Sequence, residues 1–164
     1  MSNETLARLS MQSLTDSSFD QIVQCMREGA SPNIYVNQKH LIVILYEVQA
    51  RTTNTESQLL NKTIVLLRTV GVDISMPYCI GGNMSLIDYL DANFKHIMRS
   101  SMSNNTTKLI NIYLDRPVNV RDEDIPLVIK YKCLNILKSL KSYSPATIRL
   151  SILSGHSSVV NLLI

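Results

Sequence analysis

Cysteine is scarce in this sequence, and its placement excludes the common structures that cysteine builds. The three cysteines, Cys25, Cys79 and Cys133, are odd in number and far apart, which does not describe a disulfide framework. No Cys-x-x-Cys, His-x-x-x-His or His-Glu-x-x-His motif is present, so we expect no metal site. Glycine is rare too, and Gly81-Gly82 is the single adjacent pair. We therefore expect no phosphate-binding glycine loop and no cofactor.

Long hydrophobic runs are also missing. The longest covers residues 41–46, which is far too short to cross a bilayer. The opening residues Met-Ser-Asn-Glu-Thr are polar and acidic, unlike a secretory signal peptide. We therefore expect a cytoplasmic chain with reduced thiols and no membrane contact. Its 164 residues, 45% of them hydrophobic, have room for one core, so we expect a single domain over residues 1–164.

Acidic residues are absent from the last part of the chain. Residues 125–164 contain five basic residues and no Asp or Glu, and because the whole chain carries a net charge of +3, residues 1–124 carry −2. A basic end can attract acidic partners. These basic residues recur at helical spacing between apolar ones, which more often marks the solvated side of helices. Nucleic-acid binding is not expected, because no Gly-aromatic RNA motif or basic-aromatic run is present.

Ingredients for catalysis are few. The chain has three histidines, His40, His96 and His156, and a Cys–His pair could still form in space. No known local signature surrounds any of the cysteines. Cys25 and Cys133 fall on apolar helix faces, where a buried thiol is the ordinary explanation, which leaves Cys79, beside the glycine pair, as the candidate reactive thiol. We expect no enzyme and no catalytic residues.

The positive signal is a series of helix pairs. Residues 5–14 predict a first helix, and Asp16 or Ser17 can cap a second helix with Phe19, Ile22, Val23 and Met26 on its apolar face. Residues 29–33, Gly-Ala-Ser-Pro-Asn, end that helix, because glycine adopts the left-handed conformation after the last turn and proline prevents continuation.

Four further pairs follow the first. In the second, residues 40–50 and 59–70 form helices around a polar loop at 51–57, with Gly71 closing the pair. In the third, the turn 81–83 leads into a first helix at 85–90, which residues 94–98 extend. The loop 100–105 then leads to a return helix at 106–114. The segment that closes this third pair, residues 115–119, lacks a glycine. Residues 124–140 give a compressed pair with a corner at 131–133. Residues 145–164 give the last pair, with its corner at Gly155-His156.

One segment has two readings. The apolar run 41–45 could be a buried strand. A helix between two stacked neighbours would be equally apolar, and the flanking pattern favours the helix.

The pentad 29–33 and the Gly155-His156 corner resemble the ankyrin-repeat family, whose repeat of about 33 residues is a turn plus a helix pair. The spacing from Gly29 to Gly71 is 42 residues, longer than the family period, and an inserted surface loop costs little free energy. The resemblance implies an all-α, ankyrin-like solenoid of about four to five irregular helix-turn-helix repeats. It also implies that His156 is structural and hydrogen-bonds across its corner.

Proteins of this family bind partners through the turns between repeats and the helices that follow them. By register, the resemblance gives a partner-binding site of Asn33, Tyr35, Asn37 and Lys39 in the first turn, Met76 and Tyr78 in the second, and Arg116, Arg121, Asp122 and Glu123 in the third. Exposed tyrosine often anchors an interface, so Tyr35 and Tyr78 are the first to test. The alternative is that each tyrosine packs beneath its own turn.

The loose repeats and the many Ile, Asn, Ser and Lys residues resemble ankyrin proteins that viruses and intracellular bacteria direct at host cells. This likeness implies a chain that is part of a larger protein and binds a host or cellular protein in the host cytoplasm. Two alternatives stay open. One is the substrate-targeting domain of a larger effector enzyme whose catalytic domain is absent here; the other is a helical repeat domain with a scaffolding role in its own cell.

Overall fold

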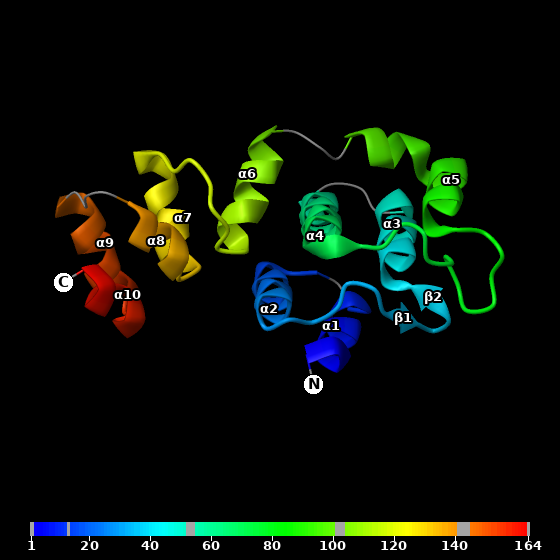
Figure 1. Ribbon diagram of the computed structural model, residues 1–164, viewed down its shortest axis with the longest axis horizontal. Coiled ribbons are helices and arrows are strands. Elements are labelled where there is room, and N and C mark those ends of the chain that lie inside the picture. The colour runs from blue at the N-terminus through cyan, green and yellow to red at the C-terminus, as the bar shows by residue number, and fades with distance from the viewer. Residues whose placement is uncertain (1, 13, 52–54, 101–103, 141–144, 164) are drawn as a thin grey trace. The chain divides into compact units, whose positions relative to one another are not determined.

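The computed structural model describes residues 2–12, 14–51, 55–100, 104–140 and 145–163 (Figure 1). These residues form ten α-helices and little strand, so the predicted all-α class is confirmed. The chain divides into two compact units, residues 1–106 and 107–164, which are described in turn. None of the helices described is both long and apolar enough to span a lipid bilayer.

The first unit contains five helices and a short hairpin among its described residues. They are α1 (Ser2–Ser10), α2 (Asp16–Arg27), β1 (Tyr35–Val36), β2 (Lys39–His40), α3 (Leu41–Arg51), α4 (Thr55–Gly71) and α5 (Leu86–Ser100). Helix α1 packs against α2 and α3, α2 packs against α4, and α3 packs against α4 and α5. Fully buried side chains fill the space between them, among them Leu6, Ile22, Leu41, Tyr46 and Leu66.

The apolar run 41–45 is helical, as the flanking pattern favoured, and opens α3. Four of its five side chains are buried, because neighbouring helices cover α3 on several sides. The predicted loops at 51–57 and 100–105 are wrong where the structure describes them: Arg51, 55–57, Ser100 and 104–105 are helical, whereas 52–54 and 101–103 lie outside the described residues. Polar residues are common both in loops and at the ends of helices, so polarity did not distinguish the two there.

The second helix of the first pair, α2, begins with a different cap from the one predicted. The N-cap of α2 is Thr15 rather than Asp16 or Ser17. The Thr15 hydroxyl accepts a bond from the Ser18 amide at 3.1 Å, and the Ser18 hydroxyl accepts one from the Thr15 amide at 2.7 Å. This reciprocal capping box satisfies two amides at once, which neither predicted residue achieves. Helix α1 also begins and ends earlier than predicted, and Leu14 is buried outside it.

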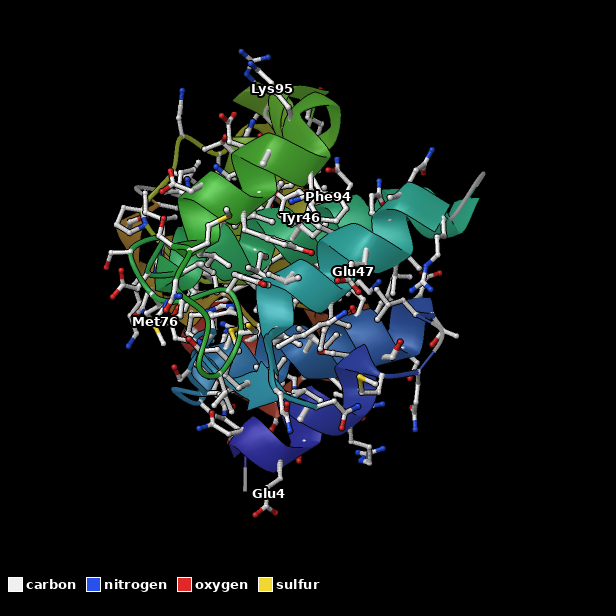
Figure 2. The ribbon with its side chains drawn as sticks, turned by 90° about the vertical axis from the view of Figure 1, so that its right-hand side faces the viewer. Glu4, Tyr46, Glu47, Met76, Phe94 and Lys95 are labelled. Carbon is white, nitrogen blue, oxygen red and sulfur yellow. The ribbon has the colours of Figure 1, made fainter. Side chains whose placement is uncertain are left out.

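Helix α5 bends at Phe94, whose backbone is non-helical (φ −133°, ψ 27°). Figure 2 shows the Phe94 ring directed toward Tyr46 of α3, and the ring centroids lie 5.8 Å apart. Tyr89, one turn earlier on α5, lies 6.2 Å from Phe94. The bend thus coincides with an aromatic cluster that attaches α5 to α3.

The second unit has its own core. It comprises most of α6 (Asn104–Tyr113), the 3-10 turn η1 (Asp122–Asp124), α7 (Ile125–Lys130), α8 (Leu134–Ser139), α9 (Pro145–Ser154) and α10 (Ser157–Leu163). Helix α7 packs against η1 and α9, and α10 packs against both α8 and α9. The buried cluster includes Ile112, Val128, Cys133, Leu137 and Val159. The predicted corners at 131–133 and 155–156 are confirmed, since each separates two helices.

Three helices end in the same way with three different residues. Gly29, Asp115 and Lys132 each have a positive φ, of 93°, 55° and 51° respectively. In each case the following amide bonds back to a carbonyl five residues earlier: Ala30 to Cys25 at 3.0 Å, Arg116 to Asn111 at 2.9 Å and Cys133 to Val128 at 3.0 Å. This is the Schellman pattern. The third pair therefore closes like the first although its closure lacks a glycine.

Candidate interaction surface

Residues 33–40 form a β-hairpin that projects from the start of α3. Strands β1 and β2 pair antiparallel with Tyr35 opposite His40. The two turn residues, Asn37 and Gln38, have φ of 50° and 70°, the positive values that suit a two-residue hairpin turn. Asn37, a predicted partner-binding residue, is exposed at this turn.

The second turn, residues 73–86, pairs with the hairpin (Figure 1). The His40 amide donates to the Tyr78 carbonyl at 2.9 Å, and the Ile80 amide donates to the Gln38 carbonyl at 2.8 Å. The turn also folds on itself, since the Leu86 amide donates to the Met76 carbonyl at 2.7 Å. We call residues 33–40 and 73–86 together the tip surface. The six predicted site residues of the first two turns all belong to it.

Tyr35 connects the two turns. Its hydroxyl donates to the Pro77 carbonyl at 2.7 Å, and its ring meets the His40 ring edge-on at 5.6 Å. Desolvation, with the nearby Cys79 and Asp73 as further causes, raises the pKa of the Tyr35 hydroxyl. The side chain is half-buried: its hydroxyl reaches the second turn, whereas its ring lies against His40 of its own hairpin.

Tyr78 lies against α5. Its ring stacks on the Tyr89 ring with 4.0 Å between centroids and 2° between planes. A hydrogen bond with Cys79 is the main reason why the pKa of the Tyr78 hydroxyl is raised. One face of Tyr78 is therefore covered by its own chain, and Tyr78 supports the turn as well as lining it. Met76, also half-buried, contributes the backbone bond to Leu86.

Asn33 holds the first turn to the end of α4. Its side-chain amide donates to the Gly71 carbonyl at 3.0 Å, and its Oδ1 accepts from the Asp73 amide at 2.8 Å and lies 3.2 Å from His40 Nε2. These bonds use both ends of the amide group. Asn33, predicted as a partner-binding residue, therefore stabilises the tip surface from within.

His40 is fully buried beneath the hairpin. Its Nδ1 accepts from the Ile42 amide at 3.1 Å, so Nε2 carries the proton and donates to Asn33. Burial lowers the pKa of His40 from 6.5 to about 4, with Asp73 opposing the shift. The imidazole is thus neutral near pH 7 and acts as a structural link.

Lys39 is paired along the helix that follows it. Its Nζ lies 2.9 Å and 3.1 Å from the two carboxylate oxygens of Glu47 on α3. The Lys39 side chain is 47% exposed. An exposed pair of this kind contributes little to stability, so Lys39 stays accessible to a partner.

Sequence reasoning missed the most exposed apolar residues of the tip surface. Ile74, Ile80 and Met84 are 49%, 63% and 43% exposed, and all three lie in the second turn. They stand beside Asp73 and the Gly81-Gly82 pair, in a stretch too irregular for a helical pattern. Apolar side chains within a glycine-containing turn are the signal that could have identified these three exposed residues.

The four site residues predicted for the third turn lie in the second unit. Arg116, Arg121, Asp122 and Glu123 are all exposed. Arg121 faces Glu123 at 3.9 Å, and its amide donates to the Asp124 carboxylate at 2.9 Å. This turn therefore presents mixed charge in place of apolar side chains. The predicted site is divided between six residues of the first unit and four of the second.

The cysteines and the corner histidine have structural surroundings. Cys25 and Cys133 are buried, as predicted, and Cys79 is half-buried in the second turn. The Cys133 thiol donates to the Ile112 carbonyl at 3.0 Å. His156 bonds through its backbone: its amide donates to Ser154 Oγ at 3.2 Å, and its carbonyl accepts the Val159 and Val160 amides of α10, each at 3.0 Å. Among the residues described, no cluster of His, Cys, Asp and Glu could hold a metal ion.

Comparisons with protein-family models, with curated proteins and with solved structures find no match to this chain.

Proposed function

We propose that the chain is an ankyrin-like stack of helical hairpins that binds a protein partner through its turns. Packing within each unit supports this reading. In the first unit α1 contacts α3 and α2 contacts α4, and in the second α7 contacts α9 and α8 contacts α10. Each helix thus packs on the corresponding helix of the next hairpin, as repeated units do when they bury a shared core.

The tip surface carries the proposal. Two backbone bonds of 2.9 and 2.8 Å join its turns, and Tyr35 and Asn33 add side-chain bonds between them. On this ordered framework Ile74, Ile80 and Met84 remain exposed. Exposed apolar side chains on an ordered surface are typical of protein-binding sites. The framework limits the conformational entropy lost on binding.

The proposed partner is a host or cellular protein. Support for a host partner comes from the compositional likeness to ankyrin proteins of viruses and intracellular bacteria, and it places the interaction in the host cytoplasm. The exposed aliphatic residues support a partner with a complementary apolar patch. In this proposal the chain itself acts by binding.

The test is a pull-down with the full chain as bait, followed by mass spectrometry. The bait variants are Ile80→Ser and Met84→Ser at the tip surface, and the control is Met11→Ser, which is similarly exposed at the end of α1. We expect one protein to be captured by the wild type and by the control, and to be reduced at least about tenfold with the tip variants. Equal capture by all four baits contradicts the proposal.

A further inference from the structure

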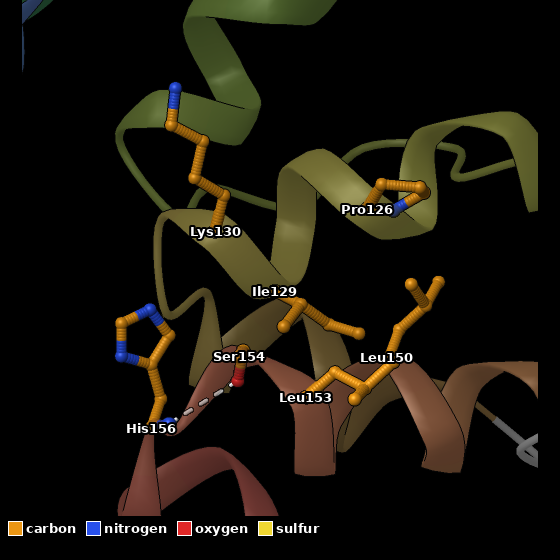
Figure 3. Close-up of a pocket in the computed structure, with 7 residues that line it drawn as sticks. All are labelled: Pro126, Ile129, Lys130, Leu150, Leu153, Ser154 and His156. Carbon is orange, nitrogen blue, oxygen red and sulfur yellow. Dashed lines mark hydrogen bonds between the residues drawn. The ribbon is translucent and has the colours of Figure 1, made fainter.

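An open groove lies between α7 and α9 of the second unit (Figure 3). It encloses about 360 Å³. Pro126 and Ile129 of α7 line one side, and Leu150 and Leu153 of α9 line the other. The lining is therefore mostly aliphatic, although the groove opens to solvent.

Leu153 is the most exposed large apolar residue in the described part of the chain. It is 74% exposed, compared with 2% for Ile129 across the groove. Both belong to the lining, so a segment lying in the groove would cover Leu153 and contact the surface of α7. Ile152, its neighbour on α9, is 55% exposed but does not line the groove.

An exposed lysine lies at one end of the groove, and the turn at the other end of α7 carries charges of both signs. Lys130 and His156 line one side, away from Pro126 (Figure 3). Lys130 is exposed, with its Nζ 5.4 Å from the centre of the Tyr131 ring. Helices α7 to α10 contain no Asp or Glu. The nearest carboxylate in sequence, Asp124, precedes Pro126 at the opposite end of α7 and pairs with Lys108, while Glu123 faces Arg121.

We propose that this groove binds an acidic, apolar peptide segment of the partner protein, which extends the interaction proposed above to a second contact. Aliphatic side chains of the segment pack against Leu153, with Pro126 and Leu150 completing the apolar lining. Its carboxylates lie near the exposed Lys130, where α7 to α10 carry no Asp or Glu that would repel them. Complementary charge at Lys130 favours an acidic segment, and burial of the apolar residues supplies the affinity.

The experiment selects random linear peptides, displayed on phage, against the full chain. Enriched peptides are synthesised with a fluorophore, and their binding is measured by fluorescence polarisation. We expect net negative peptides that contain Leu, Ile or Phe. Leu153→Ser weakens their binding at least about tenfold, which corresponds to about 1.4 kcal/mol, whereas Ile152→Ser leaves it unchanged. Lys130→Glu weakens the binding of acidic peptides, and a selection against this variant favours neutral or basic peptides.

Several results would overturn the groove as an acidic-peptide site. They are no enrichment, enrichment of neutral or basic peptides by the wild type, and equal losses with Leu153→Ser and Ile152→Ser. Self-association that Leu153→Ser abolishes, measured by light scattering, would assign the groove to a second copy of the chain instead. Circular dichroism of each variant checks that it folds. Leu153 and Ile152 are both exposed enough for the fold to tolerate serine.

The two proposals fail separately. If the selected peptides are released by Ile80→Ser but not by Leu153→Ser, the tip surface remains a binding site and the groove inference is wrong. If the pull-down captures nothing that depends on Ile80 or Met84, while acidic peptides still require Leu153, the tip surface is wrong and the groove remains.

Discussion

His40 shows how a single side chain makes the fold depend on pH. It is buried, accepts a bond from the Ile42 amide and donates one to Asn33. The bond from the Ile42 amide requires the neutral imidazole, because a protonated ring has no acceptor nitrogen, whereas the bond to Asn33 can form in either state. Burial lowers the pKa of His40 to about 4 in the folded chain, whereas in the unfolded chain the value returns to about 6.5.

The first prediction concerns this residue. Between the two pKa values the unfolded chain binds a proton that the folded chain does not, so stability is complete above about pH 6.5 and falls as the pH drops toward 4. We expect urea denaturation to show a loss of about 2 kcal/mol from this group between about pH 7.5 and about pH 5. In the His40→Gln variant, this part of the dependence of stability on pH disappears.

His156→Gln serves as the control, because His156 lies at the α9–α10 corner and is only half-buried. It should retain the pH dependence of the wild type. A His40→Gln variant with the same slope as the wild type would show that His40 is not the titrating group.

At the scale of elements, the helix ends decide where each hairpin turns. Asp115 and Lys132 occupy nearly the same left-handed conformation after α6 and α7. Their side chains differ in what they add. The Asp115 carboxylate accepts the Asn135 and Ile136 amides, each at 3.0 Å, and so caps α8 from outside that helix. The left-handed backbone conformation of Lys132 costs conformational energy because of its Cβ atom, and glycine, which has no Cβ, would avoid that cost.

The second prediction is therefore a pair of glycine substitutions with opposite signs. Asp115→Gly relieves backbone strain but removes both acceptors, and we expect a net loss of about 1 kcal/mol in the free energy of unfolding. Lys132→Gly relieves the same strain, and we expect a gain of up to about 1 kcal/mol. Chemical denaturation measures both. Two changes of the same sign would show that the Asp115 bonds do not determine its contribution.

Whole-molecule behaviour depends on the division into two units. The second unit has a buried cluster that consists only of residues between 112 and 163. Leu66, by contrast, is fully buried in the first. When each unit has its own core, a cavity in one core should lower local stability mainly in that unit.

The third prediction tests this division with matched core substitutions. Leu137→Ala removes a fully buried side chain from the second unit, and Leu66→Ala removes one from the first. Each should cost about 2–5 kcal/mol. Native-state hydrogen exchange should show lost protection in 107–164 for Leu137→Ala and in 1–106 for Leu66→Ala. Equal losses across both units with either variant would indicate one cooperative domain.

Local signals in the sequence predicted much of this molecule. The helical reading of residues 41–45, the closure at Gly29 and the corners at 131–133 and 155–156 are all confirmed. Such features depend on residues within a few positions of one another, and helix periodicity, glycine and proline report directly on them. The Thr15 cap was missed because Asp16 and Ser17 are equally good caps in isolation.

The sequence by itself determined the helices, most of their ends and the burial of Cys25 and Cys133. Tertiary structure alone decided which turn residues are accessible. Asn33 and Tyr35 became internal ties because their partners are Gly71, Asp73 and Pro77, about 40 residues away. Ile80 stayed exposed because its amide, and not its side chain, joins the hairpin. Contacts between residues so far apart are fixed only when the helices pack, and no local pattern specifies them.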